Sequence, residues 1–399
     1  MIVAKFGGTA LADGKNWQKV LNILKENDKF AIVVSAPGAR FLGDKKVTDM
    51  LYEYYYTKPE NAKKIIWKKI SERFGEIACF LGVNIDYLLE ETRLLTLEAD
   101  LPYVVSRGEY LSSKLFSLVS NKKHIDSAQK IKFDDNGRIM EKLTEQLLFD
   151  ACAPDLNGYV LGGFFGSDLS GKIRLFDRGG SDITGALVAS AINAELYENW
   201  TDVSGFFVCD PRIVLNPVKI NCLSFEQLKI LSTLGASVLH PQSVYPAQRK
   251  NIPINIKSVF KPFDNGTFVM PTTKNQGDVL GIVATDVVCF DVLNHKNNLY
   301  LSDALYVCQN CGFCTVVLKK SLYDGKFPQN DGILFKREAT LVSVLVDGKF
   351  CVSDQIRCAL NKANLSAKIL CDDFGLSMCL TAPNTTKLAT RVVYDYFFN

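Results

Sequence analysis

The first residues of the chain combine a short apolar run with a lysine and a glycine pair. Met1 to Ala4 predict a buried strand, which leads directly into Lys5, Gly7 and Gly8. A helical pattern follows from Trp17 to Leu24, so this stretch predicts a strand, a glycine turn and a helix. Backbone N–H groups in such a turn can hold phosphate, and a lysine at the strand end can contact its oxygens as a point charge. The same residues also fit a tight strand–helix connection with a solvated lysine, so both interpretations stay open.

A second cluster lies between Phe176 and Ala186, where an arginine and two glycines precede a helix of small residues. Arg178 can bind a carboxylate through two parallel hydrogen bonds. Ser181 and Asp182 could contribute polar groups to the same ligand, or one of them could serve only as the helix N-cap. This cluster is therefore a candidate site for a carboxylate or a phosphate.

Two further clusters carry charge in short motifs. Arg107, Gly108 and Glu109 precede a helix predicted from about Leu111, and a glutamate early in a helix is also favourable for dipole reasons alone. Thr201-Asp202 and Asp210 to Arg212 could hold the ribose and phosphates of a nucleotide or could form a solvated loop. A P-loop is excluded at residues 8–15, because the spacing is one residue too long and Asn16 replaces the required Ser or Thr.

The elements that must position these clusters alternate between strand and helix over about the first 270 residues. Phe30 to Ser35 is a continuous apolar run, typical of a strand covered on both faces. Residues 128–133 and 158–161 predict further strands, and residues 162–166 predict a loop that needs the flexibility of glycine. The alternation predicts an α/β fold with a three-layer architecture, in which helices cover both faces of a sheet. Residues 266–277 are polar and rich in turn-forming residues, so we expect one domain over 1–275 and a second over 276–399.

The pattern of the second domain is roughly two copies of strand–helix–strand–strand–helix, which predicts two small α+β modules with a regulatory role. The predicted strands are 283–293, 315–318, 339–346, 367–371 and 375–380, and the predicted helices are 299–308, 353–363 and 386–398.

Composition excludes several functional classes. The 399 residues carry a formal net charge of +3 from 46 basic and 43 acidic side chains, so no nucleic-acid partner is expected. No apolar run is long enough to span a membrane, and the N-terminus lacks the pattern of a signal peptide. Twelve cysteines without a secretory signal predict reduced thiols and a cytoplasmic protein.

The chain resembles the aspartate kinases of the amino-acid kinase superfamily, over roughly residues 1–285. The motifs that carry the resemblance occur in the family's order: Lys5 to Thr9, Val34 to Gly38, Lys46 to Asp49, Arg107 to Glu109, Arg178 to Asp182, Thr201-Asp202, Asp210 to Arg212 and Leu234 to Pro241. The resemblance implies transfer of the γ-phosphoryl group of Mg²⁺-bound ATP to the side-chain carboxylate of L-aspartate. The product would be 4-phospho-L-aspartate, the first intermediate of the pathway to lysine, threonine and methionine.

The resemblance also implies a role for each motif residue. Lys5 would contact the transferring phosphoryl group, and Asp182 would orient Lys5. Glu109 would bind the α-ammonium group of aspartate and Arg178 its α-carboxylate. The remaining residues implied in the site share a binding role: Ser35, Thr48, Gly179, Gly180 and Ser181 toward aspartate, and Gly7, Gly8, Thr201, Asp202, Phe207 and Arg212 toward ATP. The substrate carboxylate is itself the nucleophile, so alignment and charge neutralisation suffice for catalysis.

Two positions depart from the family pattern on the ATP side. Ser237 stands where a phosphate-binding lysine is usual, so Lys257 or Arg249 would have to supply that charge. Phe207 replaces a common tyrosine near the adenine. Two alternatives stay open. One is a kinase of the same superfamily for another amino-acid carboxylate, such as glutamate or acetylglutamate. The other is a catalytically weak regulatory subunit, which Ser237 favours.

The second domain resembles the ACT modules of aspartate kinases, which implies a homodimer. Residues 293–300 lack the glycine that usually follows the first strand of an effector-binding module, so the identity of an effector, lysine, threonine or none, stays open. Cys308, Cys311 and Cys314 have a spacing also found in iron–sulfur sites, although buried cysteines commonly serve as small hydrophobic residues.

Overall fold

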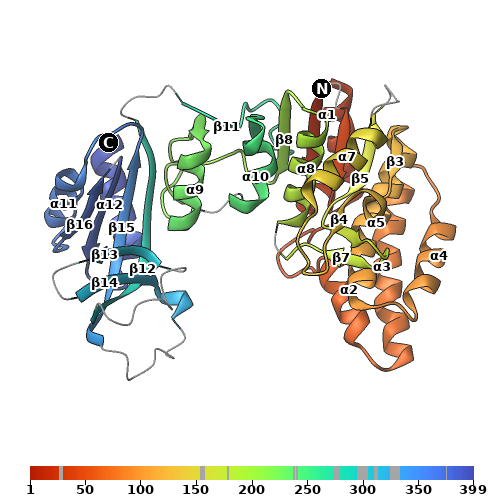
Figure 1. The fold of residues 1–399 in the computed structure, drawn as a ribbon, viewed down its shortest axis with the longest axis horizontal. Coiled ribbons are helices and arrows are strands. Elements are labelled where there is room, and N and C mark those ends of the chain that lie inside the picture. Colours follow the sequence, from red (N-terminus) through yellow and green to blue (C-terminus); the bar gives the residue numbers. More distant parts are fainter. Residues whose placement is uncertain are drawn as a thin grey trace. The chain divides into compact units, whose positions relative to one another are not determined.

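The computed structural model divides the chain into two compact units, which we describe separately (Figure 1). Unit 1 comprises residues 1–206 and 239–271, and unit 2 comprises residues 207–238 and 272–399. The structure thus groups 207–238 with the C-terminal part of the chain, and the predicted boundary after residue 275 lies outside the described residues. The described residues are 1–26, 30–152, 158–177, 179–236, 239, 241–273, 278–293, 304–309, 313–323, 333–373 and 375–399.

The centre of unit 1 is a largely parallel sheet. Its strands lie in the order β3 (Lys123–Ile125), β5 (Tyr159–Gly162), β2 (Ala31–Val34), β1 (Ile2–Phe6), β8 (Leu196–Thr201), β10 (Ile254–Ser258) and β11 (Thr267–Met270). Only β11 in this run is antiparallel to its neighbour. Every residue of β2 and β5 is buried, as the continuous apolar run predicts. β1 lies between β2 and β8, so its carboxyl end, where Lys5 lies, is central.

Helices cover both faces of this sheet, which confirms the predicted three-layer α/β fold. Successive residues of β1 alternate between the faces. Phe6 joins a core with Trp17 and Phe116. The helices on this first face are α1 (Gly14–Glu26), α2 (Val47–Tyr56), α3 (Glu60–Phe80), α4 (Asp86–Thr96) and α5 (Leu101–Ser120). The helices on the second face are α7 (Glu141–Cys152), α8 (Gly180–Ala191), which packs on β1 and β2, and α10 (Pro241–Arg249).

Three predictions within unit 1 need correction. The helix predicted from Leu111 begins at Leu101, because the Asp100 carboxylate caps it by accepting the Tyr103 N–H at 3.1 Å. The β-branched residues Val104 and Val105 near its start are buried, so tertiary packing overrides their preference for a strand. The segment predicted as one strand over 128–133 forms α6 (Ser127–Lys130) and only a short β4 (Lys132–Phe133).

The third correction concerns residues 162–166, which we predict as a flexible glycine loop. They instead contain the end of β5, a two-residue connection and the start of β6 (Phe165–Asp168). β6 pairs with β4 and with β7 (Ile173–Leu175) in a small separate sheet. Phe164 in the connection has a positive φ of 73°, so the backbone turns sharply at this point.

Unit 2 contains an antiparallel six-stranded sheet. Its strands lie in the order β13 (Ala304–Gln309), β14 (Phe313–Lys319), β12 (Val279–Leu293), β15 (Ile333–Val346), β17 (Leu376–Thr381) and β16 (Lys368–Asp373). The helices α11 (Ser353–Lys362) and α12 (Thr386–Phe398) match the predicted helices within one residue. The helix predicted over 299–308 is wrong for its described part, because residues 304–309 pair with β14 as a strand.

Helix α9 (Phe225–Leu234) belongs to unit 2 although it precedes the sheet by some distance in sequence. A reciprocal capping box between Ser224 and Gln227 begins it, and Gly235, with a φ of 119°, ends it. Leu234 packs in one core with Val287 and Leu341 of the sheet. This packing explains why residues 207–238 group with the C-terminal part of the chain.

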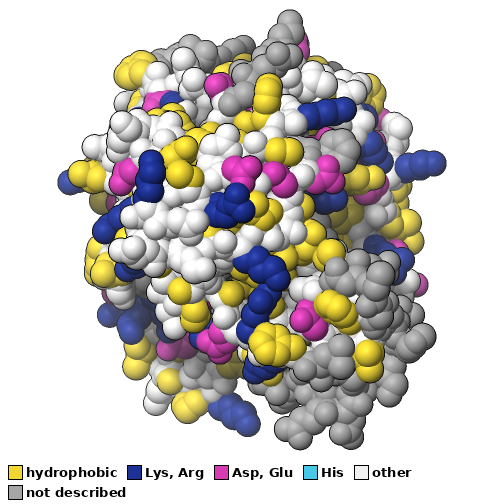
Figure 2. Space-filling model, turned by 90° about the vertical axis from the view of Figure 1, so that its left-hand side faces the viewer, with side chains coloured by type: hydrophobic (Ala, Val, Ile, Leu, Met, Phe, Trp, Pro, Cys, Tyr) yellow, Lys and Arg dark blue, Asp and Glu magenta, His cyan; other side chains and the backbone are white. Residues whose placement is uncertain are grey.

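The described helices include none that is long and apolar enough to cross a membrane. On the face shown in Figure 2, basic and acidic side chains are interspersed with hydrophobic ones. Cys308 and Cys314 lie on the paired strands β13 and β14, whereas Cys311 lies outside the described residues. No disulfide bond joins the described cysteines, and no group of three or more metal-ligating side chains occurs among the described residues.

Candidate active site

A cavity of about 250 Å³ in unit 1 gathers most of the residues predicted to bind aspartate and to act in catalysis. The first turn of α8, the carboxyl end of β1, the residue after β2, the first turn of α2 and the middle of α5 contribute to it. Its lining residues are Lys5, Ser35, Thr48, Glu109, Phe164, Gly179, Gly180, Ser181 and Asp182. With Phe164 from the connection between β5 and β6, residues from six parts of the sequence thus meet where parallel strands end, which is the usual place for a ligand in an α/β sheet.

Buried Lys5 and half-buried Asp182 form an ion pair in this cavity, with 2.6 Å between Nζ and Oδ1. Asn199 Nδ2 also donates to Asp182 Oδ1 at 2.8 Å. Asn199 lies directly beside Lys5 on the neighbouring strand, so β8 and α8 together hold the ammonium group in place. Sequence analysis does not predict Asn199, because only the strand pairing brings it to this point.

The glycine pair after β1 allows close backbone packing. The Gly7 N–H donates to the Trp200 carbonyl at 3.0 Å, so this amide is engaged in the structure rather than free for the predicted phosphate contact. The Gly8 carbonyl accepts the Gly38 N–H at 2.8 Å, and a Cβ atom on Gly8 would lie 2.9 Å from the Ala36 carbonyl oxygen. The pair therefore brings the segment after β2 onto the end of β1.

Glu109 is a buried carboxylate with an unused acceptor. It lies in the middle of α5 rather than in a first turn, so a helix-dipole role does not explain it. Its Oε2 atom is buried and has no hydrogen-bond partner. Burial raises the pKa of Glu109 to about 7, and a backbone hydrogen bond at Ala36 opposes this shift. A cationic group in the cavity would satisfy the free oxygen and stabilise the ionised form.

The N-terminus of α8 forms one wall of the cavity. Gly179 is the N-cap residue in the left-handed region, with a φ of 59°, and makes no side-chain cap. Neither Ser181 nor Asp182 is therefore the N-cap, and that alternative interpretation is wrong. Arg178, predicted to bind the α-carboxylate, lies outside the described residues, so its role stays a prediction.

Phe164 is the lining residue that sequence analysis does not predict. Its backbone packs against Gly180, where a Cβ atom would lie 2.8 Å from the Phe164 Cα. The glycines around it at 162, 163 and 166 are the signal in the sequence, since they indicate a tight chain path near this position.

The residues predicted to bind ATP are divided between the two units. Thr201 is the last residue of β8 in unit 1 and Asp202 follows it, with Thr201 Oγ1 donating to Asp202 Oδ1 at 3.0 Å. Phe207 and Arg212 belong to unit 2, and exposed Arg212 pairs with Asp210 at 2.7 Å. The structure does not place these two in relation to the cavity.

Ser237, at the position of the usual phosphate-binding lysine, lies outside the described residues. Of the two cations that could replace that lysine, Arg249 pairs with Glu141 at 2.6 Å and also with Glu145. Lys257 lies near the carboxyl end of β10, with its Nζ 4.8 Å from the centre of the Trp200 ring. Lys257 is thus the better placed candidate.

Comparison with known proteins places the chain in a family. The pattern that defines the "Amino acid kinase family" matches residues 1–258. Aspartokinase 3 of Bacillus subtilis is 33% identical over 314 residues, which cover 72% of this chain and 68% of that protein. The crystal structure of Clostridium acetobutylicum aspartate kinase matches with a TM-score of 0.85 and 30% identity, over 99% of both chains.

A second solved structure, Escherichia coli aspartokinase III in complex with aspartate and ADP, matches with a TM-score of 0.78 over 100% of both chains. Its identity to this chain is 22%, a level that shows likeness of fold. From the family pattern and the cavity together, the chain belongs to the amino acid kinase family. Within that family it belongs with the aspartate kinases, as the order of its motifs predicts.

Proposed function

We propose that this protein transfers the γ-phosphoryl group of ATP to the side-chain carboxylate of L-aspartate. A carboxylate oxygen of aspartate attacks the γ-phosphorus, the bond to the β-phosphate oxygen breaks, and 4-phospho-L-aspartate and ADP leave. The observation that carries the proposal is the cavity in which the Lys5–Asp182 pair lies with the unpaired carboxylate of Glu109. The product enters the pathway to lysine and threonine.

Each polar group of the cavity has one proposed task. Lys5 stabilises the charge that develops on the transferring phosphoryl group. Asp182, which is itself held by Asn199, keeps the Lys5 ammonium group oriented toward that phosphoryl group. Glu109 binds the α-ammonium group of aspartate, because its buried oxygen otherwise lacks a partner.

The other end of aspartate is proposed to lie toward α8. Arg178 binds the α-carboxylate, while Ser181 and the backbone of Gly179 and Gly180 support it. Ser35 and Thr48, which also line the cavity, help to hold the substrate. No general base is needed, since the attacking carboxylate is ionised at neutral pH.

On the nucleotide side, we propose that Mg²⁺ enters with the ATP phosphates. Gly8, Thr201 and Asp202 are proposed to contact the nucleotide from unit 1, and Phe207 and Arg212 from unit 2. Lys257 is proposed to supply the charge that Ser237 lacks, because Arg249 is already paired with two carboxylates. Chelation of Mg²⁺ with EDTA should abolish turnover, and excess Mg²⁺ should restore it.

We also propose that the protein forms a homodimer through the six-stranded sheet of unit 2. The support for this is the antiparallel arrangement of β13 to β16, which matches the fold of ACT modules. Light scattering on the purified chain should give twice the mass of 44.4 kDa. A mass of one chain across the micromolar range would contradict the proposal.

A trapping assay tests the proposed reaction directly. Purified protein is incubated with Mg²⁺-ATP and aspartate, and the acyl phosphate is trapped with hydroxylamine as aspartyl hydroxamate. Parallel reactions contain glutamate or acetylglutamate. We expect hydroxamate in the reaction that contains aspartate and none in the reactions that contain glutamate or acetylglutamate. Product with another acid would favour a different carboxylate kinase, and no product with any would favour a regulatory subunit.

A further inference from the structure

The segment 36–46, which we call the connecting loop, joins two residues of the cavity. Ser35 lies immediately before it and Thr48 just after it, and both line the cavity. The loop has no helix or strand of its own. The Val47 N–H donates to the Pro37 carbonyl at 3.0 Å, which closes the loop on itself. Any group that holds this loop therefore sets the positions of Ser35 and Thr48 together.

The connecting loop also touches the glycine turn after β1. The Gly38 N–H donates to the Gly8 carbonyl at 2.8 Å, and a Cβ atom on Gly38 would lie 2.7 Å from the Gly8 carbonyl carbon. Only glycine fits at this contact. A shift of the loop would thus disturb both the aspartate side of the cavity and the turn that follows Lys5.

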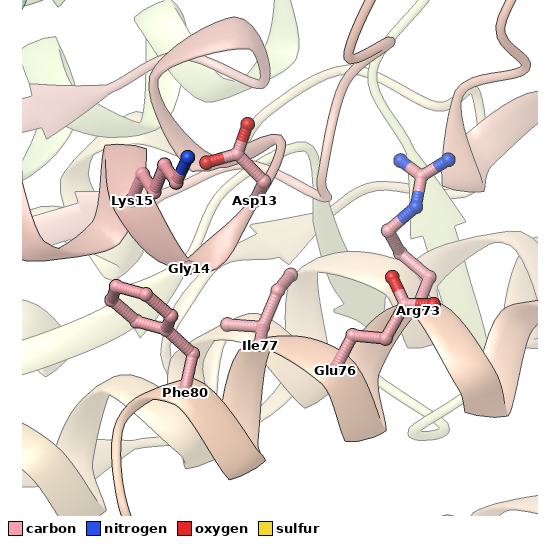
Figure 3. Close-up of a pocket in the computed structure, with 7 residues that line it drawn as sticks. All are labelled: Asp13, Gly14, Lys15, Arg73, Glu76, Ile77 and Phe80. Atoms are coloured by element: carbon pink, nitrogen blue, oxygen red, sulfur yellow. The ribbon is translucent and has the colours of Figure 1, made fainter.

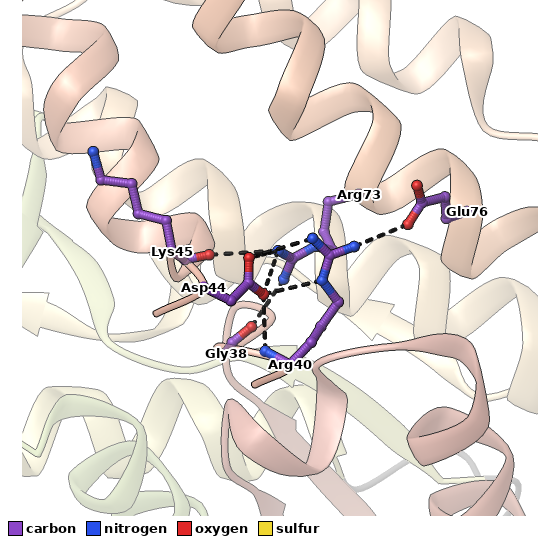
Figure 4. A network of polar contacts seen from close by, with 6 residues as sticks. All are labelled: Gly38, Arg40, Asp44, Lys45, Arg73 and Glu76. Atoms are coloured by element: carbon purple, nitrogen blue, oxygen red, sulfur yellow. Dashed lines mark hydrogen bonds and ion pairs between the residues drawn. The ribbon is translucent and has the colours of Figure 1, made fainter. Parts of the chain in front are cut away.

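Arg73 reaches this loop from the adjacent helix α3 (Figure 4). Its Nη1 donates to the Gly38 carbonyl at 2.9 Å, and its Nη2 donates to the two Asp44 carboxylate oxygens at 2.8 and 3.0 Å. Only 4% of Arg73 is exposed to solvent. A planar guanidinium can make these bonds simultaneously in fixed directions, which an ammonium group cannot.

The residues around Arg73 keep its position fixed. Ile70, Phe74 and Ile77 on the same helix are buried in the core of unit 1. Asp44 has a second partner, Arg40, at 3.0 Å, and hydrogen bonds from Arg40 hold the pKa of Asp44 well below its usual range. Arg40 belongs to the loop itself and reaches α3 only through an exposed ion pair with Glu76 at 3.2 Å, so Arg73 is the buried tie between the loop and the helical core.

From these contacts we propose that Arg73 is a positioning residue for the phosphoryl-transfer reaction, which fixes the connecting loop and thereby Ser35 and Thr48. The inference rests on the proposed function for its kinetic consequence, but the anchoring itself can be measured independently. Arg73 touches neither the cavity nor a reacting atom, so its effect passes through the loop.

The space beside Arg73 makes the inference testable by substitution. A separate cavity of about 330 Å³ adjoins it, lined by Asp13, Gly14, Lys15, Arg73, Glu76, Ile77 and Phe80 (Figure 3). A methionine side chain of similar length can adjust into this space without overpacking the core. Arg73→Met therefore removes the charge and all donors, while Arg73→Lys keeps the charge but not the forked geometry.

The experiment uses the full chain and two measurements. Amide hydrogen exchange over residues 36–47 reports the anchoring, and steady-state kinetics with aspartate reports the consequence. Arg73→Met should speed exchange at least tenfold and lower kcat/KM for aspartate by about 10- to 100-fold, since a misplaced substrate group has costs of this size. Arg73→Lys should lie between Arg73→Met and the unchanged protein in both measurements.

Glu76→Gln provides the matched control, because Glu76 lies one turn along α3 and pairs only with Arg40, at 3.2 Å. It should leave both measurements within about twofold. Unchanged exchange in Arg73→Met, or faster exchange with unchanged kcat/KM, would overturn the proposal. If Arg73→Met does not fold, the proposal is judged on Arg73→Lys, by whether hydrogen exchange over residues 36–47 becomes faster and kcat/KM for aspartate falls. If the unchanged protein makes no aspartyl hydroxamate, the proposed function fails, while hydrogen exchange still decides whether Arg73 anchors the loop.

Discussion

At the scale of single residues, the cavity contains two groups of opposite charge, Lys5 and Glu109, which differ in their hydrogen-bond and ion-pair partners. The Lys5 ammonium group is neutralised by Asp182, so it is held ready at a fixed place. The Glu109 carboxylate keeps one buried oxygen without a partner, so its ionisation depends on what enters the cavity. Lys5 thus already has its partner in the protein, whereas Glu109 keeps an acceptor that a cation could satisfy.

Replacing Lys5 by methionine should lower kcat by about 10³-fold, because the removed charge is proposed to act on the transferring phosphoryl group. The fold should remain intact, since Asn199 still hydrogen-bonds Asp182. Hydroxamate formation and circular dichroism measure the two effects. Lys172→Met is the control, because Lys172 lies at the surface and outside the cavity. Turnover near the normal rate in Lys5→Met would disprove the assigned role.

The KM for aspartate should rise as the pH falls from 8 to 6. Burial raises the pKa of Glu109 to about 7, so acidification protonates the group that is proposed to bind the ammonium group of aspartate. Aspartate itself does not titrate in this range. Glu109→Gln should raise KM about 100-fold or more and remove this pH dependence. A KM that is flat from pH 8 to 6 in the unchanged protein would contradict the proposed contact.

The same carboxyl group should make the ligand-free protein less stable as the pH rises. A pKa raised on folding means that stability is fully present below the unfolded pKa of about 4.5 and is lost as the pH rises through about 7. At pH 8 the loss is about 3 kcal/mol. Glu109→Gln should therefore raise the melting temperature at pH 8 and have little effect at pH 4.5. Equal shifts at both pH values would show that burial of the charge is not the cause.

At the scale of elements, close approach between glycines and neighbouring backbones sets the width of the cavity. Gly108 of α5 meets Ala36, where a Cβ atom would lie only 2.7 Å from the alanine Cβ. Gly163 lies against Ser181 at the start of α8, with a corresponding distance of 2.7 Å to the Ser181 Cα. Both contacts lie beside residues that line the cavity. The absence of a side chain at each glycine therefore lets the neighbouring segments come close enough to form the cavity.

Gly163→Ala should displace the first turn of α8 and raise the KM for aspartate at least tenfold, because Ser181 is pushed from its place. Gly75→Ala is the control. Gly75 lies inside α3 with no atom within 4 Å of an added Cβ, so this change should stabilise the protein by about 0.5–1 kcal/mol and leave KM unchanged. Similar KM values for both variants would refute the packing argument.

At the scale of the whole molecule, the two units interrupt one another in sequence. Unit 1 resumes at residue 239 after the segment 207–238, which packs with unit 2. Leu231 lies so close to Gly281 of β12 that no side chain fits between them, and Leu234 is buried with the same sheet. A cut after the last strand of unit 1 therefore does not separate two independent domains.

A chain shortened to residues 1–273 should be poorly soluble, because the apolar face of α9 loses its partner sheet. Leu228→Ser with Leu231→Ser and Leu234→Ser in that shortened chain should restore solubility, since these three side chains are buried in the complete protein. Size-exclusion chromatography and dye binding measure both outcomes. A soluble, monomeric shortened chain without these changes would show that 207–238 does not depend on unit 2.

The sequence by itself determines the α/β class, most of the strand and helix segments and the family, because these follow from apolar periodicity and from motifs that are contiguous in the chain. It also predicts Lys5, Glu109 and Asp182 as site residues through the motifs that contain them. Boundaries governed by packing are less predictable, as the early start of α5 and the strand at 304–309 illustrate.

Only the tertiary structure decides which residues support the site from a distance. Asn199 acts through strand pairing with Lys5, Phe164 through a sharp turn against Gly180, and Arg73 through a loop that α3 reaches only in three dimensions. The glycines around Phe164 indicate only a tight turn, and the contacts of Asn199 and Arg73 have no local signature, because hydrogen bonds and steric fit between distant segments depend on positions that the whole fold sets. Short motifs in the sequence therefore predict the chemical groups of the site, and long-range packing determines how these groups are arranged.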